Sequence, residues 1–200
     1  AGQGTAVDLL MIGPLTNLAL ALHRDPGIVR GIGRVTIMGG TLNGRGNTTP
    51  AAEFNIYADP EAAAVVFRAE LAITLVPWEP CTTHFIEGAA LDELLDRIPA
   101  GSVRDFGKAL ADHSRRTHLA YEGQSDVMKY VDTLAAAVVI DPSIVTGRIA
   151  ASVDVALSPG ITRGMTVVDP SGRLGTPKAD VVERADGAAI DAIYRRSLGG

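Results

Sequence analysis

The sequence predicts an α/β fold with a mostly parallel, open sheet flanked by helices. Short apolar runs at Val7–Ile12, Val35–Met38 and Ala72–Val76 have the length and composition of strands that are buried on both faces. Segments with apolar residues at helical spacing separate these runs. An alternation of strands and helices favours parallel pairing with right-handed crossovers.

Helices are expected between the first strands because capping signals precede the helical patterns. Thr16–Leu22 is the first pattern, and Ile28–Ile32 is a short helix that Asp25-Pro26 can open. A further helix begins at Asp59-Pro60, where Asp59 is a good N-cap and proline suits the first helical position.

The second half of the chain is expected to contain three helices, followed by short strands and a last helix. Residues 87–120 carry two successive amphipathic patterns, and Thr133–Ile140 is an apolar helix stopped by Asp141-Pro142. Short additional strands near the C-terminus are joined by Ser-Pro-Gly and Pro-Ser-Gly turns, and a final amphipathic helix follows. These strands are expected at Ile149–Leu157, Ile161–Val168 and Val181–Val182. No repeat or linker interrupts the chain, so residues 1–200 are predicted to form a single domain.

Composition narrows the class of protein. The 200 residues are 46% hydrophobic and 20% charged, as in an ordinary globular domain. A net charge of −5 without a basic stripe argues against nucleic acid as a partner. No apolar run is long enough to cross a bilayer, so no membrane partner is expected. One cysteine excludes an intrachain disulfide and favours a reducing, cytoplasmic location.

A group of polar residues follows the second predicted strand. Asn47, Glu53 and Asn55 lie between that strand and the helix that begins at Asp59-Pro60. Loops after strands in open α/β sheets are where ligand groups collect. Two amides and a carboxylate offer mixed donors and acceptors, which suit a polyhydroxylated ligand such as a sugar better than a phosphate. The alternative is that these groups only form turns and a helix cap.

Asp132 precedes an almost wholly apolar helix, which leaves two interpretations open. As an N-cap it would accept a backbone N–H of that helix. As a metal ligand it would contribute a carboxylate oxygen to a hard cation such as calcium, and further ligands would then be needed.

Other reactive residues have weaker patterns. His84 and His118 lie in polar contexts and are weak candidates for proton transfer. Cys81 has no neighbouring histidine and is expected to be a small buried hydrophobe. The glycine-containing segments form no nucleotide-binding fingerprint, and no serine nucleophile elbow is present.

The order of several short motifs resembles that of the inosine–uridine preferring nucleoside hydrolase family. The resemblance runs from about Val7 to the C-terminus, and its strength lies in the motifs together. They are Ile12-Gly-Pro-Leu-Thr-Asn-Leu-Ala19, Ile37-Met-Gly-Gly40, Ala52-Glu-Phe-Asn-Ile56, Asp59-Pro-Glu-Ala-Ala63, Val131-Asp-Thr-Leu-Ala135, Ile140-Asp-Pro-Ser143 and Gly164-Met-Thr-Val-Val168.

The resemblance implies an enzyme that hydrolyses the N-glycosidic bond of ribonucleosides into base and ribose. In that family calcium binds the attacking water and the ribose 2′- and 3′-hydroxyls. The resemblance implies that Asp132 ligates Ca2+ through its carboxylate and Ile12 through its backbone carbonyl. Homodimers or homotetramers are the implied assemblies.

The resemblance also implies a ribose-binding set. Asn47 and Glu53 would hold the 5′-hydroxyl, Asn55 would bind the lower hydroxyls, and Met38 would line the sugar pocket. Gripping the hydroxyls would fix the ring in its reactive shape, and polar groups around the sugar would stabilise an oxocarbenium-like transition state.

Two departures from the family pattern shape what is expected of this chain. The aspartate-rich opening motif, which supplies the general base and most calcium ligands, is absent. The chain is therefore predicted to be the C-terminal two-thirds of a longer hydrolase that by itself binds calcium poorly and catalyses little. Valine stands at position 131, where a histidine protonates the departing base in well-studied members. His118, Tyr121 and Tyr130 are the replacement candidates, and the alternative is a substrate whose base leaves without protonation.

These departures leave two other hypotheses open. The first hypothesis is a sugar- or nucleoside-binding relative without turnover. The second is a subunit that completes its site with a second chain. The sequence does not indicate which base is preferred.

Overall fold

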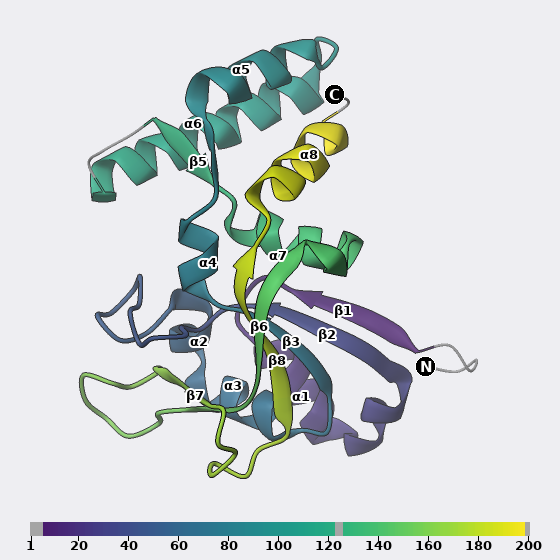
Figure 1. Ribbon diagram of the computed structural model, residues 1–200, viewed down its shortest axis with the longest axis vertical. Coiled ribbons are helices and arrows are strands. Elements are labelled where there is room, and N and C mark those ends of the chain that lie inside the picture. Colours follow the sequence, from purple (N-terminus) through teal and green to yellow (C-terminus); the bar gives the residue numbers. More distant parts are fainter. Residues whose placement is uncertain (1–5, 123–125, 199–200) are drawn as a thin grey trace.

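A six-stranded sheet forms the centre of the protein (Figure 1). The computed structural model describes residues 6–122 and 126–198, and for residues 118–122 it describes the backbone alone. The strand order is β1-β2-β3-β8-β6-β7. The first four of these are parallel, whereas β6 and β7 continue the sheet in antiparallel fashion. The expected mostly parallel α/β fold is confirmed. The strand bounds are β1 Val7–Met11, β2 Ile32–Met38, β3 Ala72–Val76, β6 Val145–Val155, β7 Thr166–Asp169 and β8 Lys178–Ala185.

Helices α1 (Thr16–Arg24) and α3 (Pro60–Arg68) cover one face of the sheet. Their apolar residues form one core with Val35 and Ile37 of β2. Successive side chains of a strand point to opposite faces, so Thr36 and Met38 belong to the other side. The caps expected for this region are present, since Asp59 accepts the Ala62 N–H at 3.0 Å and Pro60 is the first residue of α3.

A second core covers the opposite face. It contains Met38 of β2 and Val76 of β3 together with residues of α4 (Trp78–Thr82), α7 (Val131–Ile140) and α8 (Gly187–Ser197). Helix α7 packs directly against β1, β2 and α4. The carboxyl-terminal parts of β2 and β3 are therefore buried on both faces, which explains their nearly continuous apolar sequences. Strand β1 was also expected to be buried, but it is the outermost strand of the sheet, and Val7 and Leu10 are exposed.

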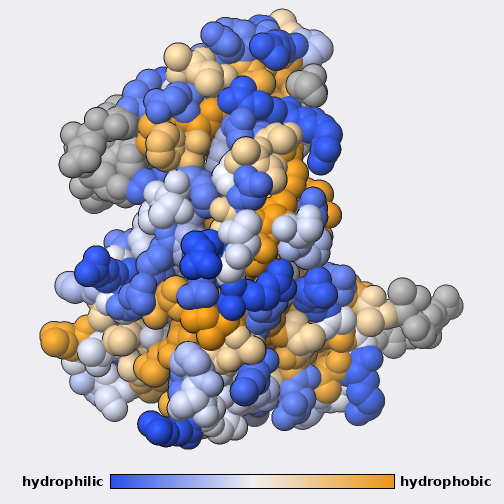
Figure 2. Space-filling model, in the orientation of Figure 1, coloured by the Kyte–Doolittle hydropathy of each residue, from blue (hydrophilic) through white to orange (hydrophobic). Residues whose placement is uncertain are grey.

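The two successive helices expected between residues 87 and 120 lie at one end of the long axis, away from the sheet (Figure 1). They are α5 (Gly88–Arg97) and α6 (Ser102–Glu122), and a short antiparallel ribbon of β4 (Phe85–Glu87) and β5 (Val127–Lys129) joins this end to the rest. Figure 2 shows that the outline narrows between this helical end and the sheet.

Some boundaries differ from those expected. The strand expected at Ile161–Val168 begins only at Thr166, because residues 160–165 form turns that include Gly164 at φ +80°. Strand β6 begins earlier than expected, at Val145. Segment η1 (Pro26–Gly31) is a 3₁₀ helix, as is η2 (Pro142–Ile144). Helix α2 (Phe54–Ala58), α4 and the β4–β5 ribbon were not expected, because each is too short to show a periodic pattern.

None of the helices in the described part of the chain combines the length and apolar character needed to cross a bilayer.

Candidate functional site

The candidate site lies at the carboxyl ends of three adjacent parallel strands. Ile12 follows β1, Met38 ends β2 and Val76 ends β3. The N–H of Gly39 donates to the Val76 carbonyl at 3.1 Å, so the pairing of β2 and β3 continues past the last strand residue. Loops that leave this edge are the common ligand-binding segments of open α/β sheets.

Glu53 is buried at this edge, with only 2% of its surface exposed. Its Oε2 accepts the N–H groups of Gly40 at 2.8 Å and Ile56 at 3.3 Å, and its Oε1 accepts that of Asn55 at 2.8 Å. Burial raises the pKa of the Glu53 carboxyl, these three N–H groups lower it in part, and the charge of Asp132 raises it further. Glu53 is thus the N-cap of α2, and Oε1 retains a lone pair for a ligand.

Asn55 presents one side of its amide to the protein and the other to the site. Its Nδ2 donates to the Met38 carbonyl at 3.1 Å and lies 3.4 Å from the Met38 sulfur. Its Oδ1 accepts no hydrogen bond from any residue that the structure describes. A buried amide held by its nitrogen offers its oxygen, which is an acceptor for a hydroxyl group.

Asn47 lies on the exposed loop that precedes α2. Its Oδ1 accepts the Phe54 N–H at 2.8 Å and the Thr48 hydroxyl at 3.3 Å. These bonds tie the loop to the start of α2, beside Glu53. Asn47, Glu53 and Asn55 therefore belong to one local structure, in which turn and cap bonds coexist with unused acceptors and donors.

Asp132 does not cap α7, which corrects the first of the two interpretations of this residue. Tyr130 occupies the N-cap position, and no side chain caps the helix. Asp132 lies within the first turn, where its carboxylate accepts no hydrogen bond from the described residues. Although the side chain reaches solvent, partial burial raises the pKa of its carboxyl. Because no described residue occupies its oxygens, the Asp132 carboxylate is available to a ligand.

Cys81 lies near both Glu53 and Asp132. Its Sγ donates to the Val131 carbonyl at 3.6 Å, and its side chain is fully buried, as expected for a small hydrophobe. Burial raises the pKa of the Cys81 thiol, and the nearby charges of Asp132, Glu53 and Glu79 raise it further. The two acidic site residues therefore share one neighbourhood, although 79 positions separate Glu53 from Asp132 in the sequence.

The residues that hold the loop after β2 were not predicted from the sequence. Glu79 accepts the N–H of Leu42 and that of Asn43, both at 2.7 Å. The buried Thr166 hydroxyl donates to the Thr41 carbonyl at 2.7 Å. Glu79 adjoins Trp78 in a segment that carries no recognisable motif, so only the fold reveals this role.

The candidates for protonating a leaving group are not assembled by these contacts. His118 and Tyr121 have side chains outside the described part of the structure. The hydroxyl of Tyr130 donates to Asp191 at 2.7 Å, and its ring packs against Tyr194 with centroids 5.1 Å apart. Burial, followed by the contact with Asp191, raises the pKa of Tyr130. A role for any of the three stays a prediction.

The described residues fit part of a calcium site. The Asp132 carboxylate has the chemistry of one ligand, and the Ile12 carbonyl follows β1 at the same edge of the sheet. Within residues 6–122 and 126–198, however, no three His, Cys, Asp or Glu side chains gather closely enough to hold a metal. Because calcium takes six to eight oxygen ligands, these residues do not complete a site.

The protein thus has an α/β fold with a cluster of polar side chains at the carboxyl ends of its parallel strands. The chain belongs to the inosine-uridine preferring nucleoside hydrolase family, whose profile matches residues 1–192. This finding confirms the resemblance seen in the sequence motifs.

Individual relatives agree with this assignment. The non-specific ribonucleoside hydrolase RihC of Salmonella paratyphi B is 40% identical over 170 residues, which are 84% of this chain and 52% of that protein. The plant nucleoside hydrolase PpNRh1 superposes with a TM-score of 0.87 at 28% identity, over 96% of this chain and 61% of its own. The purine-preferring ribonucleoside hydrolase from Gardnerella vaginalis gives 0.86 at 26% identity, over 96% and 60%. The chain spans about half the length of the curated relatives it matches.

Proposed function

We propose that the complete protein to which these 200 residues belong hydrolyses the N-glycosidic bond of ribonucleosides and releases base and ribose. Membership of the nucleoside hydrolase family supports this activity. The observation that carries the proposal is that buried Glu53 lies close enough to the Asp132 carboxylate to feel its charge, at the strand ends where Asn55 offers an open acceptor.

The residues of this chain would bind and orient the ribose. Oδ1 of Asn55 would accept a hydrogen bond from one of the lower ribose hydroxyls, and the remaining lone pair of Glu53 would accept one from the 5′-hydroxyl together with Asn47. Met38 would lie under the sugar, since its sulfur already contacts the Asn55 amide. Hydroxyl contacts of this kind hold the ring near its reactive geometry.

Negative charge at the site would also lower the barrier. The transition state of glycoside hydrolysis resembles an oxocarbenium ion, so a nearby carboxylate stabilises it more than it stabilises the ground state. Glu53 is fixed by three N–H donors and does not need to reorganise as positive charge develops on the sugar.

We further propose that the activity depends on calcium, with Asp132 and the Ile12 carbonyl among its ligands. When bound, the ion would orient the ribose diol and make a bound water easier to deprotonate. The remaining ligands would come from residues beyond those named here. The protonation of the departing base would fall to His118, Tyr121 or Tyr130, or the substrate would carry a base that leaves unaided.

The proposal also includes a cytoplasmic location, a homo-oligomeric assembly and a small-molecule substrate. The single thiol, buried in the second core, suits a reducing cytoplasmic compartment. A nucleoside or other N-riboside is the substrate, and a homodimer or homotetramer is the proposed assembly. Native mass spectrometry would measure the assembly and would also detect a second chain if one completes the site.

A binding protein without turnover is the second candidate function, and Val131 favours it because valine cannot donate a proton. Release of reducing sugar by the complete protein from a panel of purine and pyrimidine nucleosides, with calcium present, separates the two. Sugar release that Asp132→Asn abolishes supports hydrolysis. Binding of ribose or a nucleoside in calorimetry, without release of sugar, supports the binding protein. If neither binding nor release is observed, the assignment of this site to nucleosides is wrong.

A further inference from the structure

A polar cavity lies at the amino ends of the parallel strands, whereas the candidate nucleoside site lies at their carboxyl ends. The cavity has a volume of about 320 Å³ and is lined where β2 and β3 begin and where α7 ends. Asp132 in the first turn of α7 and Val138, which lines the cavity, are six residues apart, which is roughly 9 Å along the helix axis. The cavity is therefore separate from the candidate nucleoside site.

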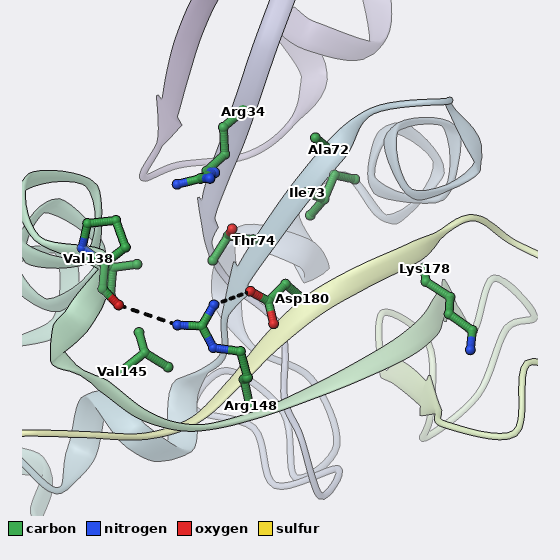
Figure 3. Close-up of a pocket in the computed structure, with 10 residues that line it drawn as sticks. Arg34, Ala72, Ile73, Thr74, Val138, Val145, Arg148, Lys178 and Asp180 are labelled. Carbon is green, nitrogen blue, oxygen red and sulfur yellow. Dashed lines mark hydrogen bonds and ion pairs between the residues drawn. The ribbon is translucent and has the colours of Figure 1, made fainter.

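Four consecutive strands each contribute one polar side chain to this cavity. In sheet order these are Arg34 on β2, Thr74 on β3, Asp180 on β8 and Arg148 on β6. Thr74 pairs with Asp180 across β3 and β8, which places this row on one face of the sheet. Figure 3 shows Arg34 and Arg148 extending from the two sides of the row toward the same space, with Lys178 at the margin.

Several of these groups are not satisfied by the protein. The guanidinium of Arg34 makes no ion pair with a described residue. Thr74 is only 8% exposed, yet its hydroxyl forms no hydrogen bond within the part of the chain that the structure describes. Arg148 donates to Asp180 at 2.7 Å and to the Pro142 carbonyl at 3.3 Å. Its guanidinium has five N–H donors, so further donors remain.

The charges of the lining favour an anion. Among the described lining residues, Arg148 and Asp180 form an ion pair, so Arg34 supplies the unpaired positive charge of the cavity and Lys178 adds a second one at its margin, within a chain whose net charge is −5. The carboxyl end of α7 opposes an anion, but a helix end carries only about half a unit charge. The charges of Arg34 and Lys178 outweigh it.

We propose that this cavity binds a phosphate monoester, with Arg34, Arg148 and the Thr74 hydroxyl as the donors to the phosphate. Planar guanidinium groups match the oxygens of a phosphate, and a neutral hydroxyl adds a donor without adding charge. The volume lies at the lower end of the range for ligand pockets, about 300–1,000 Å³, which suits a small ester such as a sugar phosphate. This inference does not depend on the hydrolase activity.

Isothermal titration calorimetry with inorganic phosphate, ribose 5-phosphate and neutral ribose tests the proposal. Both phosphate-bearing probes should bind through this cavity, with the ester binding more tightly, and Arg34→Gln should weaken both by roughly tenfold or more. Thr74→Val keeps the shape of the side chain and should weaken binding less. Arg97→Gln removes an exposed arginine at the far end of α5 and should change nothing.

A further variant distinguishes binding at this cavity from binding at the nucleoside site. Asp132→Asn should leave phosphate binding unaltered, because Asp132 lies at the other end of α7. Circular dichroism would confirm that Arg34→Gln is folded. The proposal is overturned if neither phosphate probe binds at millimolar concentration, or if binding is equally strong in Arg34→Gln and the parent protein.

Discussion

Glu53 and Gly40 are joined by a hydrogen bond of 2.8 Å between a buried carboxylate oxygen and a backbone N–H. The bond connects the loop that leaves β2 to the first turn of α2. Gly40 has a positive φ of +71°, and a Cβ at this position would come within 2.7 Å of the Thr166 side chain. The shape of the candidate site therefore depends on the absence of a side chain at Gly40 as much as on Glu53.

Replacing Glu53 by glutamine should destabilise the protein by about 1–3 kcal/mol. The new amide nitrogen would face at least one of the N–H groups that now donate to the carboxylate, leaving a buried donor unsatisfied. Urea denaturation followed by circular dichroism measures the change. Glu70→Gln, on an exposed acidic residue, serves as the control. An unchanged midpoint in Glu53→Gln would show that the cap bonds contribute nothing.

Asp132→Asn should remove calcium-dependent activity and yet increase stability near neutral pH. Burial raises the pKa of Asp132 above 3.8, so the folded state disfavours the charged form. The folded protein therefore binds the proton of this carboxyl more strongly than the unfolded chain does. The free energy of unfolding falls as the pH rises from the pKa of Asp132 in the unfolded chain to its higher pKa in the folded protein.

The gain in Asp132→Asn should consequently appear at about pH 7 and shrink toward about pH 4, where aspartate becomes protonated. Thermal melting of both proteins across this range, without calcium, measures it. A variant that melts lower than the parent at neutral pH would mean that Asp132 has a stabilising partner.

Gly40→Ala should destabilise the protein by roughly 1–3 kcal/mol, because alanine would adopt a strained backbone conformation and crowd Thr166. Gly107→Ala is the matched comparison. Gly107 lies inside α6, where an added methyl group would make ordinary contact with Leu95 at 3.5 Å. That change should stabilise the protein by about 0.5–1 kcal/mol. Equal effects of the two substitutions would contradict the role of Gly40.

Tyr130→Phe tests one candidate for protonation of the leaving base. The Tyr130 hydroxyl already donates to Asp191, so its removal should cost about 0.5–1.5 kcal/mol of stability. Turnover measured at saturating nucleoside should change by no more than a few-fold. A loss of several orders of magnitude in a folded variant would instead identify this hydroxyl as the acid.

The sequence predicted those parts of the fold that depend on local signals. Asp59-Pro60 was expected to begin a helix, and the structure confirms it, because capping and the fixed φ of proline act within a single turn. Short elements such as α2 and α4 were missed because five residues do not complete two helical turns. The start of β7 was misplaced because the turns before it depend on Gly164 having a positive φ.

For the candidate site, the available residue types can be read from the sequence alone: two asparagines, Glu53 and the aspartate before an apolar helix. Their burial and hydrogen bonds cannot. It is the folded chain that shows that Asp132 is not a cap, that Asn55 directs its nitrogen at Met38, and that Glu79 holds the loop after β2. Local propensity acts between residues a few positions apart, whereas burial and charge at this site arise from segments that the packing of α7 against the sheet brings together.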